Sequence, residues 1–372
     1  MSDADDLLAF IDSAPTPYHA VAESAARLIA AGFGEVDLAA EWPIGGDHFV
    51  TRGGALIAWS APVDSPELPV RIIGAHTDSP NLRIKPRPDM DKAGFRQLDV
   101  EPYGGLLLNS WLDRDLGLGG RAIVRDGPGR AIAKLFRDDR PLLRVPQLAI
   151  HLDRDISTKG LMLNRQEHMT PVWGLGEASD GEFASWLAEV VGVPSGDVLG
   201  WDAMCHDTSP AGFLGATEEL ISAARLDNLC SCFGAVKSLV ASSGVADAVP
   251  MIALFDHEEV GSTSATGADS ALLGQVIQRL VASRDGGPDD VVRSLAGSSC
   301  LSADMAHGTH PNYADLHEPN HWITLGGGPV IKTNLNLRYA TDGVSGAEFR
   351  LACERVGVPV QEYSHRNDLT CG

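Results

Sequence analysis

Two short and almost continuous apolar runs each end in ionisable residues, and this feature constrains the fold more than any other. The first is PVRIIGA at 69–75, followed by HTD at 76–78, and the second is VPMIALF at 249–255, followed by DHEE at 256–259. Apolar runs without alternation are typical of strands that are buried on both faces. In open α/β sheets, ligands bind beyond the carboxyl ends of such strands. The chain is therefore predicted to carry a ligand site at one edge of a buried sheet.

Helical and strand-like segments alternate on both sides of a long segment of different character. We expect helical spacing over 4–32, broken by Pro15 and Pro17, further helices at 218–242, 268–283 and 347–356, and strands at 55–60, 298–304 and 327–334. This alternation predicts one α/β domain with an open, mixed sheet. Residues 81–215 carry many Pro and Gly, short β-like pieces and a Trp-bearing helix near 181–191. That region is predicted to be a separate β-rich insertion.

Charge and composition exclude several classes of partner. The net charge is −21, from 29 basic and 50 acidic residues, so the surface repels nucleic acid and anionic membranes. No apolar run approaches the roughly 18 residues of a membrane span. The six cysteines form no CxxC pair, and the N-terminus lacks the cationic start of a secretory signal. The sequence therefore predicts a cytoplasmic protein with reduced thiols.

The residues after the two apolar runs have the chemistry of a metal site. His76 can bind a metal through one ring nitrogen while Asp78 orients the imidazole. Glu258 and Glu259 repel each other, and a cation offsets that repulsion; one can bind the metal while the other deprotonates the metal's water. The alternatives are a capping Asp beside a solvated His, and a solvated acidic turn.

Two further carboxylates complete the candidate set. Asp227 stands near a helix start, where the helix dipole favours its charge and it can bridge two cations; the alternative is a plain N-cap. Asp304 follows a short apolar segment, with His307 and His310 beside it, for which the alternative is structural histidines. One imidazole and several carboxylates without thiolate suit zinc, manganese or cobalt in amide hydrolysis.

At these residues the sequence resembles the aspartyl aminopeptidases, a family of dinuclear zinc exopeptidases. The segments that match, in family order over nearly the whole chain, are 74–86, 147–156, 225–236, 254–270, 302–313, 327–342 and 366–372. The resemblance implies a mixed-sheet α/β catalytic domain of the zinc-exopeptidase (phosphorylase/hydrolase-like) class at 1–87 plus 219–372. It also implies an inserted β-rich dimerisation domain at 88–218.

The resemblance also assigns roles to individual residues. For the metals it implies His76 and Asp304 on the first zinc, Asp227 as the bridge, Glu259 on the second zinc, Asp78 orienting His76, and Glu258 as the general base. For the substrate it implies His307 and Lys332 in the pocket, and His151 reaching the active site of a neighbouring subunit. Two Zn²⁺ per subunit are expected, with Mn²⁺ or Co²⁺ as possible replacements.

The implied activity is release of N-terminal residues, acidic ones favoured, from peptides by two-metal activation of water. The implied assembly is a dimer-based homo-oligomer, a dodecamer with an enclosed chamber. Family members continue beyond 366–372 with a Met-His-Ser segment whose His binds the second zinc, so we expect a C-terminally truncated member. The alternatives are an inactive pseudo-enzyme or fragment that lacks one ligand, a non-catalytic assembly subunit, and a related zinc deacylase.

Overall fold

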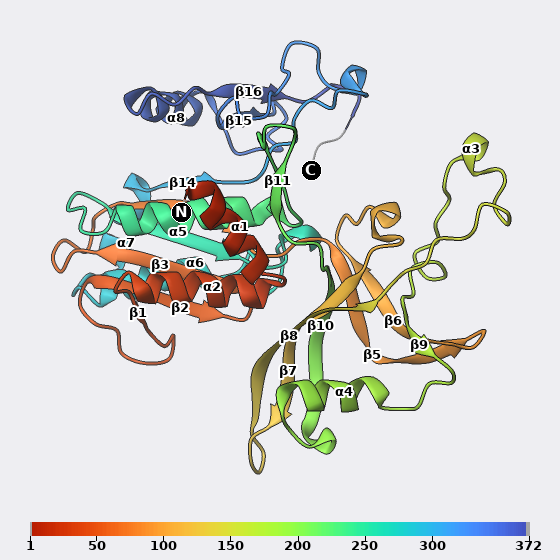
Figure 1. Ribbon diagram of the computed structural model, residues 1–372. Coiled ribbons are helices and arrows are strands. Elements are labelled where there is room, and N and C mark those ends of the chain that lie inside the picture. Colours follow the sequence, from red (N-terminus) through yellow and green to blue (C-terminus); the bar gives the residue numbers. More distant parts are fainter. Residues whose placement is uncertain (1, 370–372) are drawn as a thin grey trace. The chain divides into compact units, whose positions relative to one another are not determined.

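The computed structural model describes residues 2–369. The chain divides into two compact units, Met1–Asp304 and Met305–Gly372, and each is described by itself. The first unit contains two six-stranded sheets with their helices (Figure 1). The second unit is a small α/β element. The predicted α/β class with mixed sheets is confirmed.

The first sheet of the first unit is mixed. Its strands, in spatial order, are β1 (Gly34–Glu35), β2 (Gly46–Arg52), β3 (Ala55–Ala61), β13 (Val249–Phe255), β4 (Val70–His76) and β14 (Ser299–Ser302). Strand β4 lies between β13 and β14 and is parallel to both, whereas β3 is antiparallel to β13. The two apolar runs of the sequence are therefore adjacent parallel strands, and β13 is buried along its whole length as its composition predicts.

Helices cover both faces of this sheet, which explains why its central strands lack alternation (Figure 1). Helices α1 (Asp3–Ser13), α2 (Pro17–Ala30) and α5 (Leu226–Ala241) share one apolar cluster with Ile252 and Leu254 of β13. Helix α6 (Leu272–Ala282) shares a second cluster with Met251 and Ala253, which point to the opposite face. Helix α7 (Pro288–Gly297), which the sequence analysis missed, lies against α6 and β4.

The second sheet is antiparallel and comes from the β-rich region. Its strands, in spatial order, are β8 (Ala131–Leu143), β7 (Leu116–Arg125), β10 (Val198–Asp207), β5 (Asn81–Lys92), β6 (Phe95–Tyr103) and β9 (Val172–Leu175). Helix α4 (Glu182–Val191) packs Phe183 and Leu187 into its core. The segment with the short helix α3 (Ile156–Lys159) extends away from this sheet (Figure 1). Because β5 begins at Asn81 and runs past residue 88, the domain boundaries at 88 and 218 stay predictions.

One predicted helix is too long. The helix expected over 218–242 begins only at Leu226, and a short antiparallel hairpin of β11 (Gly212–Leu214) and β12 (Leu220–Ser222) precedes it. Arg225 has a left-handed backbone (φ 59°), so the helix cannot extend through it towards the N-terminus. The apolar periodicity of the sequence cannot predict the backbone conformation of a single residue such as Arg225.

The second unit is a strand-helix-strand element. Strand β15 (Val330–Thr333) and strand β16 (Gln361–Ser364) are parallel, and helix α8 (Gly343–Arg355) connects them. Parallel neighbours need such a crossover connection. Among the described residues, no helix is both long enough and apolar enough to cross a membrane.

Candidate metal centre

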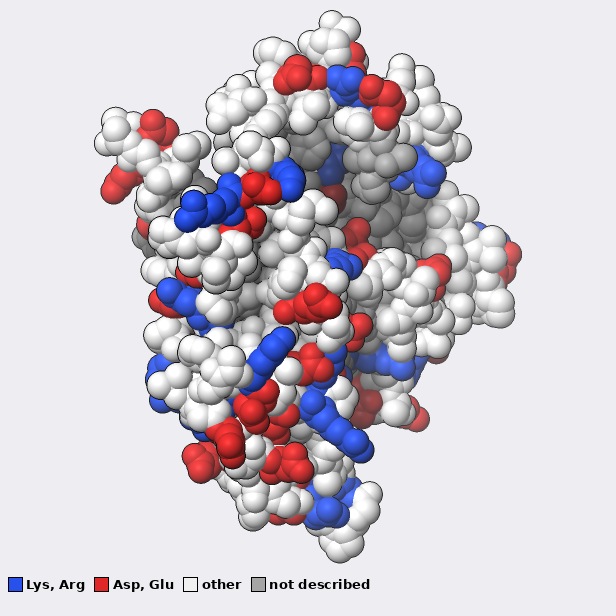
Figure 2. All heavy atoms as spheres, turned by 90° about the vertical axis from the view of Figure 1, so that its right-hand side faces the viewer, with Lys and Arg blue, Asp and Glu red and all other residues white. Residues whose placement is uncertain are grey.

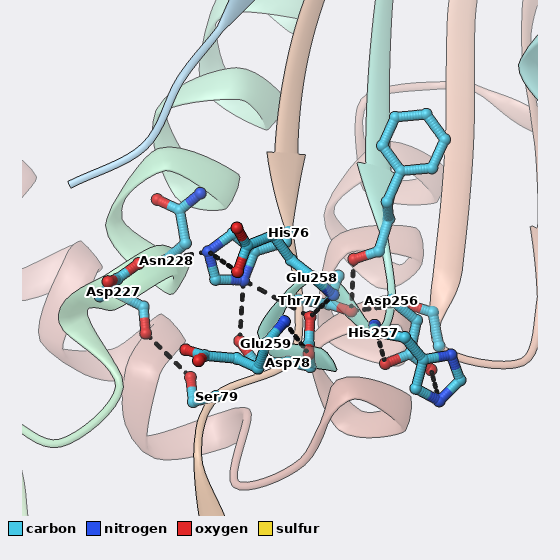
Figure 3. Close-up of polar contacts among 12 residues, drawn as sticks. His76, Thr77, Asp78, Ser79, Asp227, Asn228, Asp256, His257, Glu258 and Glu259 are labelled. Carbon is cyan, nitrogen blue, oxygen red and sulfur yellow. Dashed lines mark hydrogen bonds and ion pairs between the residues drawn. The ribbon is translucent and has the colours of Figure 1, made fainter. Parts of the chain in front are cut away.

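The parallel strands of the first sheet bring the candidate ligands to one edge. His76 is the last residue of β4 and pairs with Phe255, the last residue of β13. Ser302 pairs with Gly74, so the chain continues to Asp304 beside His76. Helix α5 brings Asp227 to the same place. Figure 3 shows His76, Asp227 and the two glutamates, Glu258 and Glu259, converging at this edge.

His76 lies at the centre of the group and is only 5% exposed. Its Nδ1 lies 2.9 Å from the backbone oxygen of Asp78, and a carbonyl oxygen only accepts, so Nδ1 carries the proton. In the neutral imidazole Nε2 is then the unprotonated nitrogen, and it faces the carboxylates, at 3.3 Å from Oδ1 of Asp227 and 3.7 Å from Oδ1 of Asp304. One ligand atom from each of these three residues lies within 4.8 Å of the others. The lone pair of Nε2 and the carboxylate oxygens of Asp227 and Asp304 therefore point into the same small volume.

The Asp78 carboxylate is fully buried and holds the backbone of the neighbouring loop. It accepts hydrogen bonds from the backbone N–H of Glu258 (3.1 Å) and of Glu259 (3.2 Å), and from the hydroxyl of Tyr103 (2.7 Å). Burial alone raises the pKa of Asp78, but its hydrogen bonds with His76 and Tyr103 outweigh burial and lower that pKa. Asp78 is therefore ionised, and it connects His76 to both glutamates.

Burial and neighbouring carboxylates shift the pKa values of this group. Burial by itself lowers the pKa of His76, but Asp227, Asp304 and Asp78 outweigh it and raise that pKa. Burial raises the pKa of Glu258. It also raises the pKa of Glu259 to about 7, with Glu258 adding to this effect and His76 opposing it. Crowded carboxylates around one imidazole nitrogen fit a divalent cation, and this donor set suits zinc.

The predicted site residues fall into two groups. His76, Asp78, Asp227, Glu258 and Asp304 are brought together, and Oε2 of Glu258 lies 3.9 Å from Nε2 of His76. Glu259 donates its backbone N–H to Asp78, and its side chain is not among the three clustered ligands. His307 and Lys332 lie in the second unit, and His151 is an exposed residue between β8 and α3. The structure therefore brings together the residues that were predicted around the first metal.

Four supporting residues around the group were not predicted from the sequence. Ser79 donates its hydroxyl to the backbone oxygen of Asp227 (2.9 Å), and Asn228 donates its amide to the backbone oxygen of Ala303 (2.8 Å). The thiol of Cys232 lies 3.1 Å from the backbone oxygen of His76, and Tyr103 bonds Asp78. Asn228 and Ser79 adjoin predicted ligands and were discoverable on that ground, whereas nothing near Tyr103 in the sequence signals its role.

Comparison with known proteins identifies the family. The family model described as aminopeptidase I zinc metalloprotease (M18) matches residues 10–372. The chain belongs to the M18 family. The resemblance to aspartyl aminopeptidases is confirmed, and this M18 protein is a metal-dependent aminopeptidase, a hydrolase of peptide bonds.

Curated relatives of this M18 aminopeptidase include proteins from Streptomyces and Mycobacterium. A probable M18 family aminopeptidase 2 of Streptomyces coelicolor is 50% identical over 374 residues, covering 99% of this chain and 86% of that protein. The protein of the same name from Mycobacterium tuberculosis strain H37Rv is 49% identical over 378 residues, with the same coverage.

Solved structures agree with the family assignment. A chain in the cryo-EM structure of the Ape4 and Nbr1 complex is 34% identical, with a TM-score of 0.94 over 100% of this chain and 76% of that chain. Yeast aminopeptidase 1 (Ape1) is 27% identical, with a TM-score of 0.85 over 97% of this chain and 84% of that chain. These similarities support both the fold and the aminopeptidase activity.

Proposed function

We propose that this M18 aminopeptidase releases N-terminal Asp or Glu from peptides and uses a centre of two metal ions. The observation that carries the proposal is the group of His76, Asp227 and Asp304, whose ligand atoms lie within 4.8 Å of one another. These three residues would hold the first zinc ion. Asp227 and Glu259 would hold the second, and Mn²⁺ or Co²⁺ could replace zinc at the same oxygen and imidazole ligands.

Zinc, when bound, supplies Lewis acidity to a peptide carbonyl and lowers the pKa of water to near neutrality. The chain supplies the general base, Glu258. Its side chain is 53% exposed, so it is accessible to a substrate and a water molecule, and its backbone is held by Asp78. Burial raises the pKa of Glu258, which brings this carboxylate closer to the operating pH of a base. It would accept a proton from the attacking water and pass it to the leaving amine.

The preference for acidic residues rests on the cationic and imidazole side chains of the second unit. The hydroxyl of Tyr363 lies 3.4 Å from Nε2 of His307 and 3.3 Å from Nδ1 of His365, and the rings of His307 and His317 are 5.5 Å apart. Lys332 lies in the same unit and donates to the backbone oxygen of Met305 (3.2 Å). An ammonium group beside imidazoles would favour a substrate carboxylate.

We also propose that the protein works as a dimer-based homo-oligomer in the cytoplasm. Leu148, Ile150 and Leu152, on either side of His151, are 58%, 65% and 76% exposed, an apolar surface that a second subunit would cover. In this oligomer His151 would reach the active site of that subunit, and residues 88–218 would form the interface. A yeast relative, S. cerevisiae mApe1, has been solved as a dodecamer. The described cysteines are all free thiols, which supports a reducing compartment.

Replacing Glu258 by Gln tests the general base. We expect kcat for an N-terminal Asp peptide to fall about 10²- to 10⁴-fold because the amide cannot accept the proton. Bound zinc, counted by atomic absorption, should stay near the wild-type value. The matched control is Glu189→Gln, an exposed glutamate of α4, which should leave kcat unchanged. Wild-type turnover by Glu258→Gln would show that another group is the base.

The acidic preference is tested with peptides that begin with Asp, Glu, Leu or Lys. We expect the highest kcat/KM for Asp and Glu, and Lys332→Met should lower these two values about 10- to 100-fold because a charged hydrogen-bond donor is lost. The value for the Leu peptide should change little. Lys92→Met, at an exposed lysine of the second sheet, is the control. A wild-type preference for Leu or Lys would overturn the proposed specificity and leave the aminopeptidase activity intact.

A further inference from the structure

The buried Asp78 carboxylate has four contacts, and the shortest does not come from the metal centre. Its Oδ1 lies 3.1 Å from the backbone nitrogen of Glu258 and 3.5 Å from Nδ1 of His76. Its Oδ2 lies 3.2 Å from the backbone nitrogen of Glu259 and 2.7 Å from the hydroxyl of Tyr103. The position of one carboxylate therefore sets the placement of three residues in the centre. The Tyr103 hydroxyl is the only one of these donors outside the centre.

Tyr103 belongs to the second sheet, not to the sheet that carries the ligands. It is the last residue of β6 and pairs with Asn81, the first residue of β5. It is 8% exposed, and the guanidinium carbon of Arg83 lies 3.5 Å from the centre of its ring. Among the described residues, the buried Nε and Nη2 of Arg83 have no hydrogen-bond partner. Stacking on the Tyr103 ring is therefore the main contact of the Arg83 guanidinium.

The residue after Tyr103 also touches the centre. Gly104 has a left-handed backbone (φ +74°), and a Cβ built there would lie 2.9 Å from Cβ of Glu259. The backbone at the end of β6 is thus in close contact with the loop of the two glutamates. The second sheet therefore meets the centre at two adjacent points, by a hydrogen bond to Asp78 and by packing against Glu259.

We propose that Tyr103 is a positioning residue of the metal centre: its hydroxyl holds Asp78, and Asp78 in turn orients His76 and the loop of Glu258 and Glu259. The inference rests on the metal site of the proposed function. Without the hydroxyl, Oδ2 of Asp78 keeps only the long bond from Glu259, and the carboxylate can rotate. Loss of such a supporting partner typically lowers metal affinity about 10- to 100-fold.

Tyr18 provides a matched control. Like Tyr103 it is buried (7% exposed), and a guanidinium, that of Arg121, lies 4.4 Å from its ring centre. Its hydroxyl has no hydrogen bond to the metal centre among the described residues. Tyr18→Phe and Tyr103→Phe therefore remove the same atom from similar stacked rings, but only the second change reaches Asp78.

The test is zinc affinity, measured by competition with a chromophoric chelator, together with the visible absorption spectrum of the Co²⁺-loaded protein. We expect Tyr103→Phe to bind zinc about 10- to 100-fold more weakly and to shift the cobalt bands. Tyr18→Phe should match the wild type within about twofold in affinity and show the same spectrum. A melting curve of the metal-free variants separates lost stability from lost positioning, because only positioning changes the cobalt spectrum of a fully folded protein.

Each outcome is informative. Wild-type zinc affinity and an unchanged spectrum in Tyr103→Phe, or equal weakening in Tyr18→Phe, would overturn the inference. The variant His76→Ala distinguishes failure of the positioning role from failure of the proposed function. If His76→Ala binds zinc as tightly as the wild type, the proposed metal site itself is wrong. If it loses zinc while Tyr103→Phe does not, only the positioning role fails. Should Tyr103→Phe not fold, Arg83→Met is the second test, because it removes the guanidinium that stacks on the Tyr103 ring. Weaker zinc binding by Arg83→Met would support the positioning role of Tyr103, and wild-type zinc affinity would overturn it.

Discussion

Gly120 shows how one residue can limit what the second sheet tolerates. It lies in β7 opposite Ala203 of β10 and has φ +148°. A Cβ at this position would lie 2.0 Å from the backbone oxygen of Asp202, a distance that no rotamer change relieves. Both the positive φ and the close backbone approach therefore require glycine here.

Gly120→Ala should destabilise the protein by about 3 kcal/mol or more, because β7 and β10 must separate to make room. Urea unfolding measures the change. Gly234→Ala is the matched control: Gly234 is exposed in α5, and a Cβ there meets nothing within 4 Å. Alanine in a helix interior should increase stability by about 0.5 to 1 kcal/mol. Equal stability of Gly120→Ala and the wild type would contradict the clash.

At the scale of elements, a half-buried histidine lies where α2 approaches the second sheet. Nδ1 of His19, in the first turn of α2, lies 2.7 Å from the hydroxyl of Thr16, the N-cap of that helix. Burial lowers the pKa of His19 to about 4, and the charges of Arg137 on β8 and His206 on β10 add to burial, while Asp139 opposes it. The packing of the helix against the sheet thus requires neutral imidazole.

The unfolding free energy should fall as the pH drops from about 6.5 to about 4 because the unfolded chain takes up a proton that folded His19 cannot. This contribution is fully present above the unfolded pKa and is lost as the pH falls towards the folded pKa. We expect a loss on the order of 2 to 3 kcal/mol. Urea unfolding at a series of pH values should show a shallower slope for His19→Gln. His151→Gln, at an exposed residue, should keep the wild-type slope; equal slopes in both variants would refute the prediction.

At the scale of the whole molecule, the excess of acidic residues is a property of the surface. Figure 2 shows Asp and Glu interspersed with Lys and Arg on one face rather than gathered into a single patch. A net charge of −21 favours solubility and opposes binding of polyanions. It does not name the substrate, because that depends on a few side chains in a pocket.

Several elements were predictable because their signals are local. The apolar runs at 69–75 and 249–255 correspond to β4 and β13, since strands that are mostly or fully buried hold few polar residues; Arg71 of β4 is the exposed exception. The helix expected over 218–242 was wrong at its start because the left-handed Arg225 has no compositional signal. Parallel pairing of β4 with β13 and β14 joins segments far apart in sequence, and only the sheet topology could establish it.

The sequence by itself determined the family and the aminopeptidase chemistry and predicted the types of ligand, because strand-end motifs such as those around His76 and Glu258 carry both residue type and local strand context. Only the tertiary structure decided that His76, Asp227 and Asp304 lie within 4.8 Å of one another, that the backbone oxygen of Asp78 sets the tautomer of His76, and that Tyr103 bonds Asp78. The physical reason is distance along the chain: residue type and periodicity are local, whereas these contacts depend on which strands pair and where two sheets meet.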